Sequence, residues 1–187
     1  QEMIESSQAF EIAADFGVDS IAVHVGNPSE EFAGASLGLQ HECILRSLEE
    51  LLPTAERLGI TIAMENIWHP TNTPEKLLDI IDHFKSENLG ICYDTGHANL
   101  MARDRGLADS NPLQGWGKFG PVPYDAGILE KLLPHVTTCH LHDNNGAYDL
   151  HMPPSTGDID WPREIGLLKK APKLKCFHNE SNILKYS

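Results

Sequence analysis

Short apolar runs alternate with amphipathic helical patterns along this chain of 187 residues, and this alternation limits the fold more than any other feature. A strand followed by a helix and another strand forms a right-handed crossover, and successive crossovers build a parallel sheet. The runs are almost continuously apolar, as in strands that are buried on both faces. We expect strands at residues 20–26, 60–66, 89–97, 136–143 and 174–181.

Helical patterns fill the segments between these runs. Residues 42–59 repeat apolar side chains at helical spacing, and Pro53 within them predicts a kinked or split helix. Residues 73–84 begin with Thr73 as N-cap and Pro74 at the first helical position. Further helices are expected at residues 6–16, 124–135 and 161–172.

Two architectures alternate strands and helices in this way, a doubly wound open sheet and a (β/α)8 TIM barrel. No G-x-G-x-x-G or G-x-x-x-x-G-K motif follows an expected strand, which disfavours the nucleotide-binding sheets. A complete barrel needs about 250 residues. We therefore expect a single α/β domain over residues 1–187, an incomplete TIM barrel of about five strands without its N-terminal and C-terminal units. Because the chain begins with Gln1, we expect its natural N-terminus to lie elsewhere.

The amino-acid composition limits which binding partners and which cellular compartment we expect for this chain. The chain has 14 Lys and Arg against 27 Asp and Glu, a formal net charge of −13 that would repel the phosphates of nucleic acid. No apolar run approaches the roughly 20 residues of a membrane span, and no signal-peptide pattern opens the chain. Four cysteines without a C-x-x-C pair are typical of reduced thiols and favour a cytoplasmic protein. Assembly into a homo-oligomer stays open.

Acidic and histidine side chains stand at the carboxyl ends of the expected strands, which converge on one face of a barrel. A buried carboxylate is costly unless a cation meets it, and Lys175 is the only Lys or Arg in the five runs. The simplest compensation is a divalent metal ion, Mn²⁺, Mg²⁺, Co²⁺ or Zn²⁺, with a structural hydrogen-bond network as the alternative. The strand-end residues are His24, Glu65, Asp94, His140 and Glu180, and the last four are the expected metal ligands. A lone His24 is more often structural.

Four motifs carry a family resemblance. The segments "AMEN", "YDTGHAN", "HLHDNNGAYDLHMPPSTGDIDW" and "NES" occur in this order between Ile21 and Ser181. Together they resemble the xylose isomerase-like TIM-barrel superfamily, which includes sugar isomerases, sugar 3-epimerases, inosose-processing enzymes and the AP-endonuclease branch (family 2). The resemblance implies that the five runs are barrel strands three to seven.

The resemblance also implies roles for single residues. The shared metal site of the family falls on the same four ligands, and in the isomerase and epimerase branches Glu65 and Glu180 also move the substrate proton. His97 matches a histidine that contacts substrate, and Asp143 matches a carboxylate that orients the groups around the metal. In the AP-endonuclease branch, additional metals are held by His24, His97, Asp149 and His151.

The segment after His140 has its own expectations. Strand alternation leads us to expect that His142 points away from the metal. Asp160 is expected to cap the helix that starts at Trp161.

Two features outside this segment are expected to lie near the substrate. Trp68 is expected to form a wall of the substrate pocket, since flat aromatic faces suit sugars, with ordinary packing as the alternative. The long loop at residues 100–123 is either a lid or substrate wall, or a surface or dimer-contact loop.

These observations favour a metal-dependent sugar isomerase or epimerase that moves a proton next to the carbonyl of a small ketose or inosose. A dehydratase on the same scaffold would share the proton removal. An AP-endonuclease-type phosphodiesterase is disfavoured by the net charge of −13 and by Leu150, where the nuclease branch usually has Arg. A binding or regulatory barrel without catalysis is the remaining class. We expect activity from the full-length parent of this chain.

Overall fold

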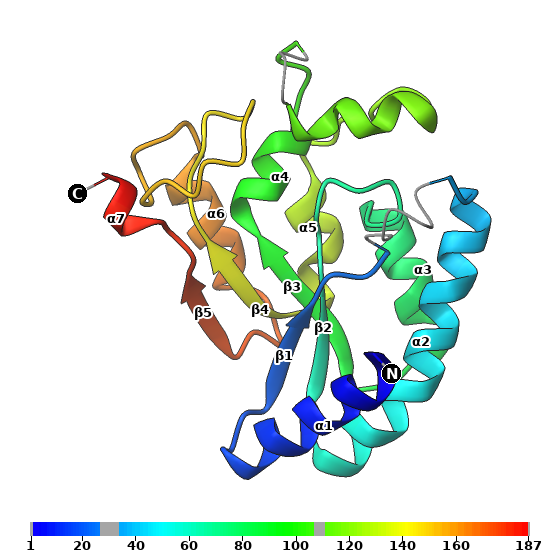
Figure 1. Ribbon diagram of the computed structural model, residues 1–187. Coiled ribbons are helices and arrows are strands. Elements are labelled where there is room, and N and C mark those ends of the chain that lie inside the picture. The colour runs from blue at the N-terminus through cyan, green and yellow to red at the C-terminus, as the bar shows by residue number, and fades with distance from the viewer. Residues whose placement is uncertain (1, 27–33, 107–110, 187) are drawn as a thin grey trace.

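Five parallel strands form one curved sheet in the computed structural model, which describes residues 2–26, 34–106 and 111–186 (Figure 1). Each strand pairs with the next one along the chain, so the crossovers all run in one direction without the reversal of a doubly wound sheet. The prediction of an incomplete TIM barrel is therefore confirmed. The strands are β1 (Ser20–Val23), β2 (Thr61–Glu65), β3 (Leu89–Asp94), β4 (Val136–Leu141) and β5 (Cys176–Asn179).

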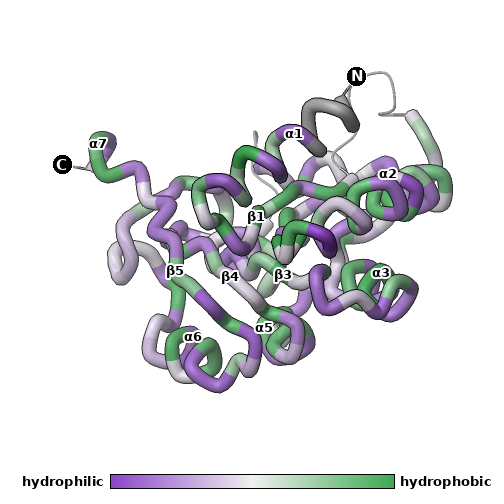
Figure 2. Tube along the Cα trace, turned by 90° about the horizontal axis from the view of Figure 1, so that it is seen from below, coloured by the Kyte–Doolittle hydropathy of each residue, from purple (hydrophilic) through white to green (hydrophobic). Residues whose placement is uncertain are grey.

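Helices cover the outer side of this sheet, as the view from below shows (Figure 2). The helices of the described residues are α1 (Glu2–Asp15), α2 (Leu37–Leu58), α3 (Pro74–Phe84), α4 (Thr95–Met101), α5 (Ile128–Leu132), α6 (Trp161–Leu168) and α7 (Ile183–Tyr186), of which α4 and α7 lie beyond the carboxyl ends of β3 and β5 (Figure 1). Two 3-10 helices, η2 (Pro112–Lys118) and η3 (Leu133–His135), complete the connections.

Helix ends follow the capping signals in the sequence. The side chain of Thr73 accepts a hydrogen bond from the backbone N–H of Lys76, and Asp160 accepts one from the N–H of Arg163, so both predicted N-caps are confirmed. Helix α2 continues through Pro53, and the predicted split is wrong. Pro53 lies on the exposed face of the helix, where water can bond to the carbonyl that proline leaves without an N–H partner.

Strand β3 ends earlier than the apolar pattern predicts. The expected strand ran to His97, but β3 ends at Asp94 and α4 begins at Thr95. The carboxylate of Asp94 accepts a hydrogen bond of 2.7 Å from the backbone N–H of His97, which makes Asp94 the N-cap of α4. His97 is therefore carried on the first turn of a helix that starts inside the mouth of the half-barrel.

The hydrophobic core lies between the sheet and its outer helices. Met64 and Tyr93 are buried there with helix residues such as Leu77. Because successive side chains of a strand point to opposite faces, the following residues Glu65 and Asp94 face the inner side of the curve. The same alternation that builds the core thus sends both acids into the barrel.

All four cysteines are free thiols; Cys43 is exposed, whereas Cys92 and Cys139 are buried. In the described parts of the chain, no helix combines the length and the apolar character needed to cross a membrane.

Candidate metal centre

Glu65, the last residue of β2, is surrounded by imidazoles. Its buried oxygens lie 3.2 Å from Nε2 of His24, 3.0 Å from Nδ1 of His97 and 3.1 Å from Nδ1 of His140. Burial by itself would raise the pKa of this carboxyl, but hydrogen bonding and charge from the three imidazoles hold that pKa well below its ordinary value. Glu65 is therefore an anion, and all of its ion-pair partners among the described residues are histidines.

Asp94, at the end of β3, is completely buried. Both of its oxygens lie 3.1 Å from Nε2 of His142, and one lies 3.9 Å from Nδ1 of His140. The capping bond from the His97 N–H fixes the orientation of the carboxylate. Asp94 therefore presents its remaining lone pairs to the inside of the half-barrel.

Glu180 completes the first cluster, which consists of Glu65, Asp94, His140 and Glu180. It follows β5, and its side chain is 40% exposed, which makes it the most accessible member. One carboxylate oxygen lies 3.6 Å from Nδ1 of His140. Ligand atoms of Asp94, His140 and Glu180 all lie within 4.8 Å of one another, as a shared ion requires. The structure therefore places Asp94, His140 and Glu180 in one group, and Glu65 joins this group through His140, which lies 3.1 Å away.

The expectation that His142 points away from this region is wrong. Residues two apart on a strand share a face, so His140 and His142 point the same way. His142 is completely buried, and its Nε2 lies 3.1 Å from Asp94 and 3.9 Å from an oxygen of Asp149. The spacing of two was the signal in the sequence that could have placed His142 in the site.

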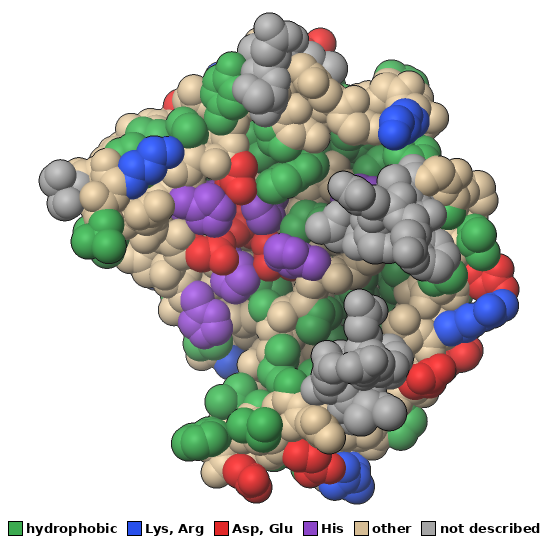
Figure 3. Space-filling model, viewed as in Figure 1, with side chains coloured by type: hydrophobic (Ala, Val, Ile, Leu, Met, Phe, Trp, Pro, Cys, Tyr) green, Lys and Arg blue, Asp and Glu red, His purple; other side chains and the backbone are tan. Residues whose placement is uncertain are grey.

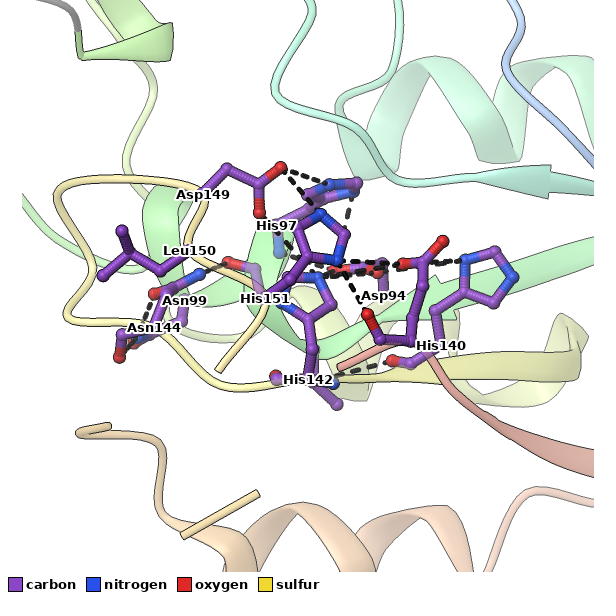
Figure 4. Close-up of polar contacts among 12 residues, drawn as sticks. Asp94, His97, Asn99, His140, His142, Asn144, Asp149, Leu150 and His151 are labelled. Carbon is purple, nitrogen blue, oxygen red and sulfur yellow. Dashed lines mark hydrogen bonds and ion pairs between the residues drawn. The ribbon is translucent and has the colours of Figure 1, made fainter. Parts of the chain in front are cut away.

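A second cluster, His142, Asp149 and His151, lies against the first (Figure 4). The rings of His142 and His151 stack with centroids 4.0 Å apart, and Nε2 of His151 lies 3.1 Å from Asp149. This contact with Asp149 raises the pKa of His151 to about 9. Asp149 is also 3.7 Å from Nε2 of His97, so His97 stands between the two clusters. Leu150 points away from the imidazoles.

Asp143 supports the loop that carries the second cluster. Its buried carboxylate accepts hydrogen bonds from the N–H of Asn144 at 2.8 Å, the N–H of Ser155 at 3.0 Å and Nε1 of Trp161 at 2.7 Å. Its backbone exchanges two bonds of 2.8 Å with Met152. Asp143 therefore orients the loop that carries Asp149 and His151, and the described residues show no hydrogen bond between Asp143 and the first cluster.

Two further side chains hold the strand ends in register, and sequence reasoning did not identify them. The carboxamide of Asn66 accepts a hydrogen bond of 2.8 Å from the backbone N–H of Asp94 and donates one of 3.0 Å to the backbone carbonyl of Asp94. The hydroxyl of Thr95 accepts from the N–H of His142 at 3.1 Å and donates to its carbonyl at 2.8 Å. A polar residue directly after a buried strand was the available signal for both.

Trp68 lies beside His97. Its ring meets the imidazole of His97 edge-on with centroids 4.8 Å apart, and its carbonyl accepts a hydrogen bond of 2.6 Å from Nε1 of Trp116. Trp116 belongs to η2, in the long loop at residues 100–123, of which residues 107–110 lie outside the described residues. The described part of this loop is therefore packed onto the connection after β2.

The donor set fits a divalent cation. Figure 3 shows acidic and imidazole side chains gathered on one face, with no Lys or Arg among them. In the described parts of the chain, Glu65, Asp94 and Glu180 have no Lys or Arg nitrogen within 4.0 Å and pair only with histidines. The Nδ1 atoms of His97 and His140 face the Glu65 carboxylate, and the buried Nδ1 of His142 has no hydrogen-bond partner among the described residues. Carboxylates and imidazoles that converge in this way are a donor set that suits a divalent metal ion.

A buried thiol adds a softer atom to this region. Cys92 forms a group with Glu65 and His140 whose ligand atoms lie within 4.8 Å of one another. Burial raises the pKa of the Cys92 thiol far above its ordinary value, so the thiol stays protonated. The carboxylates and imidazoles are therefore the stronger ligands.

A parallel half-barrel with carboxylates and imidazoles gathered at its strand ends defines an incomplete TIM barrel whose side chains could hold a metal ion. The sequence model of the xylose isomerase-like TIM barrel family matches residues 4–174, and the chain belongs to this family.

Individual relatives agree with this membership. The chain is 34% identical over 128 residues to the uncharacterised protein MJ1311 of Methanocaldococcus jannaschii, a match that covers 66% of this chain and 38% of MJ1311. A solved D-tagatose 3-epimerase-like protein is 28% identical, with a TM-score of 0.71, over 94% of this chain and 60% of that chain. A solved IOLI protein with a bound zinc atom shares the fold, with 18% identity and a TM-score of 0.67, over 95% of this chain and 59% of that chain. The chain thus spans less than two thirds of these relatives.

Proposed function

We propose that this chain belongs to a divalent-metal-dependent isomerase or epimerase that moves a proton next to the carbonyl of a small ketose, inosose or related polyol ketone. The observation that carries the proposal is the convergence of two glutamates on one imidazole. Oxygens of Glu65 and Glu180 lie 3.1 and 3.6 Å from Nδ1 of His140. The two carboxylates therefore border one space from different strands.

Glu65, Asp94, His140 and Glu180 would hold the ion, Mn²⁺, Mg²⁺, Co²⁺ or Zn²⁺. The ion supplies Lewis-acid stabilisation of the negative charge that forms on a substrate carbonyl when the neighbouring carbon loses its proton. In our proposal one glutamate removes this proton and the other returns it. Burial excludes water around Glu65, whereas Glu180 is accessible to substrate and solvent.

Surrounding residues would position the substrate. His97 lies within 3.0 Å of Glu65 and is buried, so it suits a hydrogen bond to a substrate hydroxyl. Trp68 would present an apolar wall to the C–H face of a sugar. The free thiols and the absence of a spanning helix among the described residues are compatible with the expected cytoplasmic location. The similarity to a D-tagatose 3-epimerase-like protein supports the sugar class of substrate.

The test combines metal binding with exchange of substrate protons. Chelator-treated protein is reloaded with each metal, and incorporation of solvent deuterium next to the carbonyl is measured in a panel of ketoses and inososes. We expect exchange in the wild type and none in Glu65→Gln or Glu180→Gln, with Glu50→Gln, an exposed change on α2, as matched control. Exchange that persists in both site variants would contradict the proposal.

Metal binding has an independent readout in stability. At a free metal concentration of about 100 times Kd, binding to the folded state alone adds about 2.7 kcal/mol to the free energy of unfolding. We expect this increment in wild type and Glu50→Gln, and its loss in Glu65→Gln and Asp94→Asn.

Two other reactions fit part of the site. A dehydratase would remove the same proton and then release water from the substrate, which mass spectrometry of the product detects. A phosphodiesterase of AP-endonuclease type would use the second cluster with His97, and His24 lies 3.2 Å from Glu65 as a further ligand candidate. Incision of abasic duplex DNA without sugar exchange would favour that reaction, whereas the net charge of −13 disfavours it.

A further inference from the structure

A cavity of about 380 Å³ lies on the other side of β3 from the metal centre. Tyr93 lines this cavity, and the next residue, Asp94, points to the opposite face of the strand. The walls come from α4, the start of α5 and the start of α6, and none of the four first-cluster residues contributes to them. The volume lies within the range of about 300 to 1,000 Å³ that is usual for small-molecule sites.

Arginines are concentrated in this cavity. The chain has five arginines, and three of them, Arg103, Arg105 and Arg163, line it. Four carboxylates, those of Asp125, Asp158, Asp160 and Glu164, line the same cavity, so the charge state of the site depends on how these acids are paired. Each guanidinium offers five N–H donors and no acceptor.

The acidic residues that line the cavity already have partners. Burial raises the pKa of Glu164, which accepts a hydrogen bond of 2.8 Å from the hydroxyl of Tyr93. The pairs are Asp125 with Lys131 at 2.7 Å, Asp158 with Arg105 at 3.1 Å, Asp160 with the N–H of Arg163 at 3.1 Å, and Glu164 with Arg163 at 2.5 Å. Lys131, Arg105 and Arg163 therefore offset the charges of Asp125, Asp158 and Glu164, whereas Asp160 caps α6.

Some guanidinium N–H donors around the cavity, in contrast, have no hydrogen-bond partner among the described residues. The side chain of Arg103 is 69% exposed, and its closest described contact is 3.9 Å from an oxygen of Asp158, which Arg105 already binds. The Nη atoms of Arg105 donate to Asn145, Asp158 and Asn99, and its buried Nε has no hydrogen-bond partner among the described residues. Spare guanidinium donors are matched by the several oxygens of a carboxylate or a phosphate.

We propose that this cavity is a second ligand site, which binds a small organic anion through Arg103 and Arg105. The anionic group is a phosphate monoester or a carboxylate, and the body of the ligand packs on Ala98, Ile128 and Leu129. The cavity is larger than an inorganic phosphate needs, which favours a ligand of the size of a sugar phosphate or a sugar acid. The site is separate from the place of the proposed proton transfer and does not depend on that function.

A chain of contacts links this site to the second cluster. Arg105 donates to the carbonyl of Asn145, and Asn99 donates to the side chains of Asn144 at 2.8 Å and Asp158 at 2.9 Å. Asn144 and Asn145 open the loop that carries Asp149 and His151 (Figure 4). An anion on Arg105 would therefore contact the residue that braces this loop.

Calorimetric titration tests the proposal. Chelator-treated protein is titrated with ribose 5-phosphate, gluconate, inorganic phosphate and neutral ribose, which separates the two kinds of anionic group from the sugar itself. We expect saturable binding of at least one organic anion, and none of ribose. Preference for ribose 5-phosphate would identify a phosphate site, and preference for gluconate a carboxylate site.

Variants locate the binding. Arg103→Gln changes an exposed side chain and should weaken binding about tenfold or more, whereas Arg46→Gln, an exposed arginine of α2 paired with Glu42, should leave it unchanged. Glu65→Gln should bind the anion as tightly as wild type even when proton exchange is lost. Equal affinity in Arg103→Gln and wild type, loss of anion binding in Glu65→Gln, or no saturable binding of either organic anion at millimolar concentrations would overturn the proposal.

Discussion

Nε2 of His142 lies 3.1 Å from both carboxylate oxygens of Asp94, and both side chains are completely buried. The pair joins the ends of β3 and β4 inside the half-barrel. Because His142 also stacks on His151, it connects the first cluster with the second. This relationship makes His142 a residue on which both stability and metal binding should depend.

His142→Ala should lower the free energy of unfolding of the metal-free protein by about 2 to 3 kcal/mol, because a buried carboxylate loses a partner. It should also weaken metal binding about 10-fold to 100-fold, the usual effect of removing a group that orients a ligand. Urea denaturation and metal titration measure the two effects. His178→Ala, an exposed histidine of β5, is the control and should change stability by less than about 0.5 kcal/mol. Equal stabilities of the two variants would refute the prediction.

Asn66→Ala should destabilise the protein by about 2 to 4 kcal/mol, since it leaves the buried N–H and carbonyl of Asp94 without their partner. The change should also weaken metal binding, because Asp94 is no longer held at its distance from Glu65. The matched control is Asn88→Ala, which removes one bond of 2.8 Å to the carbonyl of Ile60 at the other end of the sheet. That variant should cost about 1 kcal/mol and keep metal affinity. A parallel loss of metal affinity in both variants would contradict the positioning role of Asn66.

Gly157→Ala should destabilise the loop that carries the second cluster. A Cβ atom at this position would lie 2.2 Å from an oxygen of Asp143 and 2.4 Å from the carbonyl of Asn144. Overpacking of this kind typically costs about 1 to 3 kcal/mol. Gly166→Ala, in α6 with open space around it, should instead stabilise by about 0.5 to 1 kcal/mol. Chemical denaturation of the two variants measures both signs, and a neutral Gly157→Ala would show that the loop adapts.

Lys131→Met should remove a pH-dependent stabilisation on the outer surface. The hydrogen bond from Lys131 lowers the pKa of Glu75, so the stabilisation is present above the ordinary pKa of 4.5 and is lost as the pH falls through the lowered value. Lys131 also lies 2.7 Å from Asp125, whose pKa is lowered although burial opposes the shift. Near neutral pH we expect a loss of less than about 1 kcal/mol, because Glu75 and Lys131 are largely exposed to solvent.

Denaturation curves at neutral and acid pH measure this difference. The gap between Lys131→Met and wild type should shrink as the carboxyls become protonated. Lys170→Met, an exposed lysine of the same charge, is the control and should show no such convergence. A gap that stays constant with pH would exclude the ion pairs as its source.

Some features were determined by local sequence alone. The apolar runs predicted five parallel strands, and Thr73 and Asp160 marked helix starts, because periodicity and capping depend on neighbouring residues. The acids at the strand ends were predicted to converge because parallel strands must end on one face. Their charge could be read from the sequence, and it led to the prediction of a divalent cation among them.

Other features depend on contacts between segments that are distant in the chain, and only the tertiary structure decided them. Asn66 reaches the backbone of Asp94 across one strand pair, and Thr95 reaches the backbone of His142 across the next. The approach of Arg103, Arg105 and Arg163 to one cavity depends on how α4 and α6 pack. The local sequence determines which side chains lie on each face of a strand or helix. The distance between two such side chains from different elements depends on how the elements pack, which no local pattern encodes.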